Sequence, residues 1–309
     1  MNIAFMGTPD FAVPSLESLY QKGHNISLVV TQKDRPRGRG KKLQPTPVKK
    51  KALELGLEVY QPDFVNSQES IEHLRSLSLD CIVVIAFGQI LKKEILHMPK
   101  YGCINIHASL LPKYRGSAPI NWAIINGEKE TGITIIEMDE GLDTGDMLKW
   151  DKIPIGEDDD SESIHDKLAI LGGQLIEETL EELGNGKITK TPQDHSLYTY
   201  APMLSKSSGK IDWNSSGIYI KNLVRGLKPW PSAYMIYNGQ NVKIHEVDIV
   251  EKFSDKANGV IVEVSDKGIF VNCKDSCVAI QRLQFPGKKS LHVSEYLRGN
   301  KFDSNIKLD

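Results

Sequence analysis

The chain has 309 residues, a hydrophobic fraction of 40%, a charged fraction of 25% and a formal net charge of −2. At roughly 100–200 residues per domain, this length and composition predict two ordinary globular domains. The longest apolar run, residues 81–87, is far too short to cross a bilayer. We therefore expect no membrane segment.

The N-terminus and the cysteines favour a cytoplasmic protein. The strand-like residues 3–6 follow the first methionine almost at once, which leaves no room for a signal or transit peptide. The four cysteines include no Cys-x-x-Cys, and Cys81 and Cys103 lie inside apolar stretches. We expect buried thiols in a reducing compartment. Cys273 and Cys277 are close enough in sequence to pair, but nothing in the pattern requires it.

The first half of the chain alternates predicted strands with predicted helices. The expected strands are residues 3–6, 26–31, 81–87, 103–107 and 132–138, and the expected helices are about 14–22, 119–126 and 161–183. This alternation predicts an α/β fold with a mostly parallel sheet and helices on both faces. The turn after the first strand lacks the G-x-G-x-x-G fingerprint, which disfavours a nicotinamide dehydrogenase.

A strongly basic segment follows the second strand. Between residues 33 and 51, nine basic residues face the single acid Asp34, so the segment carries a net charge of +8. Two glycines favour mobility, and we expect Pro36, Pro45 and Pro47 to exclude regular helix. Many charge runs are simply solvated loops. Arginine beside glycine, however, suits an arm that follows phosphates, so we expect nucleic-acid contact here.

The strand at 103–107 carries two polar side chains of the kind that catalyse reactions. Alternation along a strand places Asn105 and His107 on one face and Ile104 and Ile106 on the other. Polar residues at the end of an apolar strand lie where open α/β sheets bind ligands. Taken alone, either residue is equally compatible with a structural role, as a loop contact or a satisfied core histidine.

Two loops complete the predicted site. Residues 88–91 leave the strand at 81–87, and their backbone is a candidate wall for a flat heterocycle. Residues 139–146 hold four acids and two glycines without the spacing of a calcium loop. We interpret this second stretch as an active-site loop. No His/Cys cluster offers a metal site.

The second half predicts a linker and a small β domain. Residues 190–205 show little periodicity and predict an extended linker. An amphipathic helix near 220–227 is followed by short strands at 234–237, 242–250, 259–264, 269–273 and 278–285, with a hairpin signal at Asn238-Gly239. These strands predict a small antiparallel barrel. Residues 206–309 hold 16 basic and 11 acidic residues, so this domain is basic.

The whole pattern resembles the methionyl-tRNA formyltransferase family. The resemblance covers nearly the full chain and rests on MGTPDFAVPSL (6–16), DRPRGRGKKLQPTPVK (34–49), INIHASLLPKYRGSAPI (104–120), GITIIEMDEGLDTGDML (132–148) and KPWPSA (228–233). It implies transfer of the formyl group of 10-formyltetrahydrofolate to the amino group of initiator methionyl-tRNA. It also implies a formyltransferase-type Rossmann-like catalytic domain at 1–189, a linker at 190–205 and an OB-like tRNA-binding barrel at 206–309, in a monomer without a metal.

The resemblance also assigns residues. The catalytic asparagine, histidine and aspartate of the family match Asn105, His107 and Asp143. The folate-binding segments match Gln89, Ile90 and Leu91, and Ser109, Leu110, Leu111 and Pro112. The tRNA-binding loop matches Arg37, Arg39, Lys41 and Lys42.

Formyl transfer explains why those catalytic residue types are needed. Asn105 can donate a hydrogen bond to an oxygen that gains negative charge, and His107 can donate a second one or carry a proton. Asp143, if it lies beside His107, can orient the imidazole and relay a proton through water. Two alternatives remain on the same scaffold: a sugar-nucleotide N-formyltransferase or 10-formyltetrahydrofolate hydrolase, and a catalytically silent tRNA-binding protein.

Overall fold

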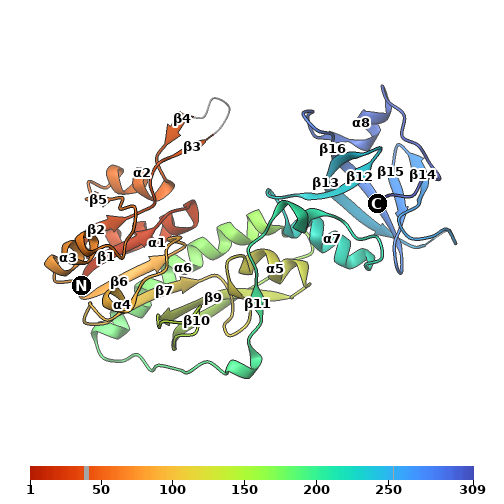
Figure 1. Cartoon of the computed structure of the whole chain (residues 1–309). Helices are drawn as coiled ribbons and strands as arrows, with labels where there is room; N and C mark the ends of the chain where they lie inside the picture. Colours follow the sequence, from red (N-terminus) through yellow and green to blue (C-terminus); the bar gives the residue numbers. More distant parts are fainter. Residues whose placement is uncertain (38–41, 253) are drawn as a thin grey trace. The chain divides into compact units, whose positions relative to one another are not determined.

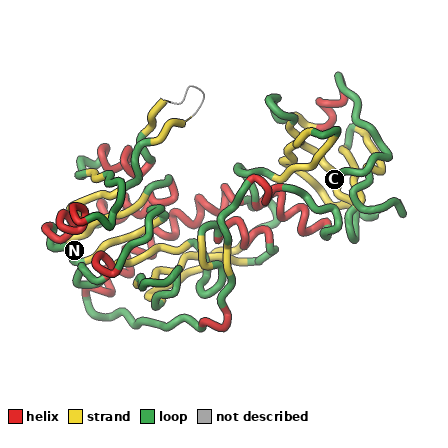
Figure 2. The backbone as a smooth tube through the Cα atoms, viewed as in Figure 1, coloured by secondary structure: helices red, strands yellow, loops and turns green. Residues whose placement is uncertain are grey.

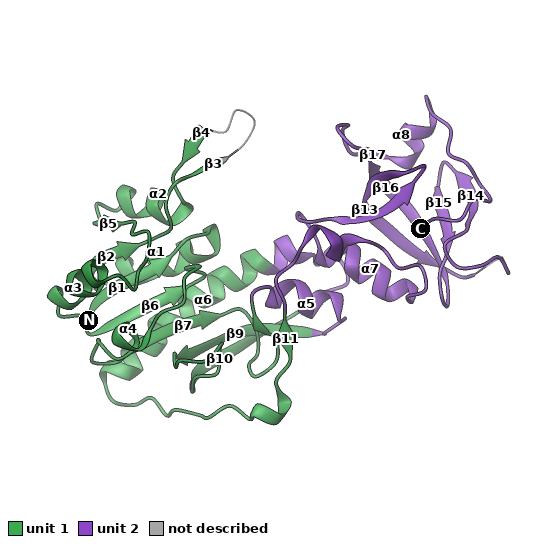
Figure 3. Cartoon of the chain, in the orientation of Figure 1, with its two compact units in different colours: residues 1–116, 130–154, 165–201 green, residues 117–129, 155–164, 202–309 purple. Residues whose placement is uncertain are grey.

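The computed structural model describes residues 1–37, 42–252 and 254–309 (Figure 1). The chain divides into two compact units, shown in green and purple in Figure 3. Unit 1 comprises residues 1–116, 130–154 and 165–201, and unit 2 comprises residues 117–129, 155–164 and 202–309. The expected domain boundaries, with a linker at 190–205, stay a prediction.

A seven-stranded sheet forms the centre of unit 1, in the order β10-β9-β7-β6-β1-β2-β5. Its strands are β1 (Asn2–Gly7), β2 (Asn25–Val30), β5 (Val59–Tyr60), β6 (Cys81–Ile85), β7 (Cys103–His107), β9 (Glu130–Glu137) and β10 (Met147–Pro154). The pairs from β7 to β5 are parallel, whereas β9 runs antiparallel to β7, and β10 runs antiparallel to β9. The prediction of a mostly parallel sheet is confirmed.

Helices cover both faces of this sheet, as predicted (Figure 2). The helices of unit 1 are η1 (Asp10–Ala12), α1 (Val13–Gln21), α2 (Pro47–Glu54), α3 (Gln68–Ser76), α4 (Lys93–Leu96) and most of α6 (Ser161–Gly184), and η2 (His195–Leu197) lies in the segment after α6. On one face, Met6 of β1 and Ile82 of β6 share a buried cluster with Leu74 of α3. On the other face, Gly172 of α6 lets that helix approach β7, because a Cβ there would lie 3.2 Å from Ile106.

The basic segment corrects one prediction. Pro47 does not exclude a helix but begins α2, at the first helical position, where a missing N–H costs nothing. The hydroxyl of Thr46 caps this helix by accepting a hydrogen bond from the Lys49 amide at 3.1 Å. Before it, β3 (Arg35–Arg37) and β4 (Lys42–Gln44) pair antiparallel.

Unit 2 is built on an antiparallel sheet in the order β12-β13-β16-β15-β14, with β17 beside β16. Its elements are α5 (Pro119–Ile125), η3 (Lys206–Gly209), α7 (Gly217–Gly226), β12 (Ala233–Tyr237), β13 (Gln240–Val250), β14 (Ile261–Ser265), β15 (Gly268–Asn272), β16 (Cys277–Gln284), β17 (Leu291–His292) and α8 (Val293–Leu297). The predicted hairpin is confirmed, and Asn238 and Gly239 both have positive φ, as a type I′ turn requires. The prediction of an antiparallel β domain is confirmed. Among the described residues no pairing joins β12 to β14, so its closure into a barrel stays a prediction.

Two further observations bear on the sequence analysis. All four cysteines are free and buried, Cys273 and Cys277 included. Within the described ranges, no helix combines the length and the apolar character needed to span a membrane.

Candidate active site

The predicted catalytic residues lie at the carboxyl end of the parallel strands of unit 1. Asn105 and His107 belong to β7, and Asp143 lies in the loop between β9 and β10. The register pairs Asn105 of β7 with Val84 of β6 on one side and with Ile136 of β9 on the other, so β6 and β9 flank the predicted site. Open α/β sheets place ligands at this end.

The imidazole of His107 is held by a backbone carbonyl. His107 is buried, and its Nε2 atom lies 2.9 Å from the carbonyl oxygen of Tyr114. A carbonyl oxygen only accepts, so Nε2 carries the hydrogen in this contact. The other nitrogen, Nδ1, faces Oδ2 of Asp143 at 3.7 Å, beyond hydrogen-bond length. The structure thus brings His107 and Asp143 together, but it is Tyr114 that orients the ring.

Asp143 occupies an unusual backbone conformation. Its φ is +53°, in the left-handed region that non-glycine residues rarely adopt. Its Oδ2 atom accepts a hydrogen bond from the Gly116 amide at 2.8 Å. Left-handed conformations at non-glycine residues cost energy and persist where the surroundings hold them, so contacts that fix this loop matter for the site.

Two residues outside the predicted set make such contacts. Gln193 donates from Nε2 to the carbonyl oxygens of Asp143 and Gly145, both at 2.8 Å. Its Oε1 accepts from Nε and Nη2 of Arg115, at 3.1 and 2.6 Å. Neither residue was predicted from the sequence. The one available signal was a charged Arg115 three positions after the predicted folate segment.

The side-chain amide of Asn105 is available to a ligand. Asn105 is partly exposed, unlike its four neighbours on β7. Within the described residues its side chain has no hydrogen-bond partner. A donor held on a rigid strand and left unpaired is suited to a group that arrives with the substrate.

The segment at 109–112 is tied to β9 by one threonine. Thr134 is fully buried, donates from Oγ1 to the Ser109 carbonyl at 2.7 Å and accepts from the Leu111 amide at 3.1 Å. The Ser109 hydroxyl donates to the Lys113 carbonyl at 2.7 Å. Ser109 and Leu111 therefore shape the loop, while Leu110 and Pro112 are its partly exposed members.

Hydrogen bonds from Val65 and Asn66 hold the loop after β6, which contains residues 88–91. Oε1 of Gln89 accepts from the Val65 amide at 2.9 Å, and the Ile90 carbonyl accepts from Nδ2 of Asn66 at 2.8 Å. Leu91 is buried, whereas Ile90 is 84% exposed. An ordered backbone with an open apolar side chain suits the face of a flat ring.

A cavity of about 680 Å³ adjoins the Asp143 loop. Its lining is acidic and includes Glu137, Asp139 and Asp146 together with His97 and His195, but none of the seven predicted folate residues. In the part of the chain that the structure describes, no group of three or more His, Cys, Asp or Glu side chains is arranged to hold a metal ion.

The predicted tRNA contacts are only partly described. The backbone of Arg37 ends β3, and Lys42 is exposed at the start of β4. Arg39 and Lys41 lie outside the described residues. In the same basic segment, Nζ of Lys49 donates to Oδ2 of Asp34 at 2.8 Å and to Oε1 of Gln61 at 2.7 Å.

This contact with Lys49, reinforced by Gln61, lowers the pKa of the Asp34 carboxyl below its usual value. Lys49 is therefore committed to a contact inside the protein rather than open to a ligand.

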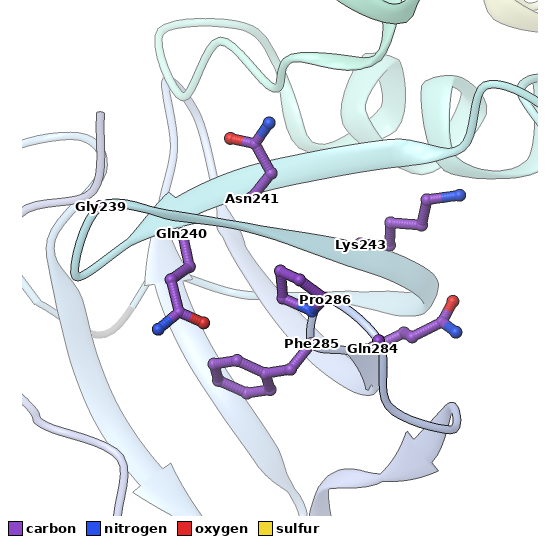
Figure 4. Close-up of a pocket in the computed structure, with 8 residues that line it drawn as sticks. Gly239, Gln240, Asn241, Lys243, Gln284, Phe285 and Pro286 are labelled. Atoms are coloured by element: carbon purple, nitrogen blue, oxygen red, sulfur yellow. The ribbon is translucent and has the colours of Figure 1, made fainter.

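Unit 2 has a pocket of its own, of about 590 Å³, at the β12–β13 hairpin and the end of β16 (Figure 4). It is lined by the amides Gln240, Asn241 and Gln284 and by Lys243, with Phe285 beside them. This lining offers hydrogen bonds and one positive charge, so it suits a polar or anionic ligand.

Comparison with known proteins places this geometry in context. A family model described as "Formyl transferase" matches residues 1–180, and one described as "Formyl transferase, C-terminal domain" matches residues 203–301. The chain is 50% identical to the methionyl-tRNA formyltransferase of Caldanaerobacter subterraneus subsp. tengcongensis, over 97% of each chain. It is also 50% identical to the enzyme of that name from Clostridium tetani, over the full length of both.

Among solved structures the chain resembles WlaRD, a sugar 3N-formyl transferase studied with dTDP and 5-N-formyl-THF. The TM-score is 0.69 at 21% identity, covering 94% of this chain and 99% of that one. This likeness concerns the fold.

Proposed function

The chain belongs to the methionyl-tRNA formyltransferase family, and from that membership we propose that it transfers the formyl group of 10-formyltetrahydrofolate to the free amino group of initiator methionyl-tRNA. The product is the N-formylmethionyl-tRNA that begins translation. The observation that carries the proposal is the approach of His107 Nδ1 to Asp143 Oδ2, at 3.7 Å, on the strand end that also presents Asn105.

The three side chains divide the work of acyl transfer. When bound, 10-formyltetrahydrofolate supplies the formyl carbon that an unprotonated amine attacks. Asn105 donates a hydrogen bond to the formyl oxygen, which gains negative charge on the way to the transition state. Asp143 accepts the proton that the amine loses, and His107, with its free Nδ1 beside that carboxylate, shares the proton and returns one to the leaving nitrogen.

The residues present fit a folate. We assign its ring system to the loop around Ile90 and to the 109–112 segment, because both lie at the carboxyl ends of adjacent parallel strands. Gln89, Ser109 and Leu111 give these walls their shape, and Ile90, Leu110 and Pro112 offer apolar surface. Leu91 supports the first wall from inside.

We further propose that tRNA is held by positive charge in both parts of the chain. Arg37, Arg39, Lys41 and Lys42 would follow the acceptor arm, since arginine and lysine pair with phosphates. Residues 206–309, which carry more basic than acidic residues, would form an OB-like tRNA-binding domain, with the Lys243 pocket of Figure 4 as one contact. Residues 1–189 would be the catalytic domain of a cytoplasmic monomer.

The test is a formyl-transfer assay with purified protein, 10-formyltetrahydrofolate and methionine-charged initiator tRNA. We expect N-formylmethionyl-tRNA to form, and uncharged tRNA and free methionine to be very poor acceptors. Two parallel reactions separate the alternatives: one replaces tRNA by an amino-sugar nucleotide, and one omits the acceptor and follows release of formate. Preferred use of either alternative, or no turnover at all, would refute the proposal.

A further inference from the structure

We propose that Gln193 is a positioning residue for Asp143, and that Arg115 in turn positions Gln193. The inference rests on the proposed function, because it concerns the loop that presents Asp143 to the reacting groups. Gln193 lies 50 residues after Asp143, in the segment predicted as a linker. The structure places its side chain in contact with the loop at residues 139–146.

The amide of Gln193 uses all of its hydrogen-bonding capacity. The residue is 5% exposed. Both N–H groups are taken, one by the Asp143 carbonyl and one by the Gly145 carbonyl, at 2.8 Å each. The oxygen accepts twice from Arg115. A primary amide has two donors and two acceptor sites, so the side chain fits this position completely and connects the arginine to the loop.

The two hydrogen bonds that Gln193 donates act on the loop at Asp143 and two residues beyond it. Asp143 has a φ of +53°, and Gly145 follows two residues later. Bonds to both carbonyls fix the peptide planes on either side of this turn, and thereby the direction in which the Asp143 side chain leaves the backbone. That direction sets the 3.7 Å approach to Nδ1 of His107.

Arg115 strengthens this support. It is 6% exposed, and its described partners are Oε1 of Gln193, Nδ1 of His195 at 3.2 Å and the ring of Tyr198 at 5.4 Å. A guanidinium stays charged in proteins. Its positive charge on the amide oxygen polarises the amide and makes the N–H groups better donors. The positive charge of Arg115 at the amide oxygen of Gln193 therefore strengthens the two hydrogen bonds that the amide nitrogen donates.

The variant Gln193→Glu separates this role from packing. Glutamate has nearly the same shape and accepts from Arg115 at least as well, but it has no N–H for the two carbonyls. We expect the loop to be released while the arginine stays paired. Turnover should fall about 10²-fold, the effect of misplacing a catalytic group by about 1 Å. The KM values for both substrates should change less than about twofold, because Gln193 touches neither.

A double variant tests whether Gln193 acts through Asp143. In the Asp143→Asn background, adding Gln193→Glu should lower turnover less than about threefold further, since a group that works only through Asp143 has little left to lose. Gln21→Glu, an exposed glutamine at the end of α1, is the matched control and should leave turnover unchanged. Losses that multiply, or normal turnover in Gln193→Glu, would overturn the inference.

Amide hydrogen exchange tests the same point without substrate. Oδ2 of Asp143 accepts from the Gly116 amide, so a displaced loop should expose that amide. We expect exchange at Gly116 and across residues 139–146 to be about tenfold faster in Gln193→Glu and unchanged in Gln21→Glu. Unchanged exchange in Gln193→Glu would overturn the inference even if the wild-type protein formylated no tRNA. Absence of tRNA formylation by the wild-type protein would refute only the proposed function.

Discussion

Nε2 of His107 donates to the carbonyl oxygen of Tyr114 across 2.9 Å, and this bond leaves Nδ1 as the imidazole nitrogen that is available for chemistry. With the hydrogen on Nε2, the neutral ring has its lone pair on Nδ1. That atom is the one that faces Asp143. In the mechanism that we propose, proton transfer therefore takes place at Nδ1, while Nε2 holds the ring in the fold.

Asn105 is expected to act mainly in the transition state. Replacing it with alanine should lower turnover by about 10²- to 10³-fold, the usual effect of deleting one donor to a developing oxyanion. The KM for 10-formyltetrahydrofolate should change little, because the bond strengthens only as charge develops. Steady-state kinetics and a melting curve check this, and near-normal turnover in a folded variant would remove Asn105 from the role.

His107 and Asp143 should behave as one unit. Because Nδ1 and Oδ2 lie 3.7 Å apart, loss of either group breaks the same proton path. We expect His107→Asn and Asp143→Asn each to be severely impaired, and the double variant to be hardly worse than the poorer single one. Single-turnover rates for the three variants measure this. Multiplicative losses would show that the two groups act independently.

The strand beside the predicted catalytic strand, β6, could be predicted because it is apolar throughout. Residues Cys81–Ile85 are all buried, and such a run has few interpretations other than a central strand. β10 was missed since it lies at the edge of the sheet and four of its eight residues are exposed, including Trp150 at 52% exposure. The start of α2 is hard to predict because Pro47 breaks a helix in most positions but not at the first helical position, where it stands here.

The supporting contacts of the site could not be predicted for a different reason. Asn105, His107 and Asp143 have recognisable side chains, and their catalytic roles stay a prediction. Gln193 and Tyr114 act on or through backbone carbonyls. Every residue has such a carbonyl, so these hydrogen bonds leave no trace in the sequence pattern, and only the fold brings Gln193 to a loop 50 positions earlier.

Buried thiols make the stability of the fold sensitive to alkali. Burial raises the pKa of Cys81 to about 12 and also raises that of Cys103. An unfolded thiol ionises near 9, so above that pH the unfolded chain has lost a proton that the folded chain keeps. The free energy of unfolding should therefore be unaffected by these groups below about pH 8 and fall as pH rises from about 9 towards 12.

A single variant isolates this effect from other titrating groups. Cys81→Ala removes one buried thiol, at a packing cost that does not depend on pH. The stability advantage of the wild type over this variant should shrink by up to about 1.4 kcal/mol for each pH unit above 9. Urea unfolding of both proteins between pH 7 and 10.5 tests it, and a constant difference would contradict the prediction.

The basic segment at residues 33–51, called the basic arm below, should control the use of tRNA rather than of folate. Lys42 is exposed on β4, and Arg39 belongs to the same basic segment. If both bind phosphates, changing them to alanine should raise the KM for methionyl-tRNA and reduce the slope of log affinity against log salt by about one for each phosphate that is no longer neutralised. Binding of 10-formyltetrahydrofolate should stay almost unchanged, because the site that we propose for it lies at the strand ends. If the arm also helps to seat the methionyl amine, turnover will fall as well.

The comparison is kinetics across a salt series for wild type, for the Arg39→Ala, Lys42→Ala variant and for Lys100→Ala, an exposed lysine outside the basic segment. The control removes one positive charge without touching the arm, so it measures the effect of net charge alone. A matching change in Lys100→Ala would assign the salt dependence to overall charge. Unchanged KM, turnover and slope in the arm variant would show that Arg39 and Lys42 do not hold tRNA, and tRNA would then have to be held by the basic residues of 206–309.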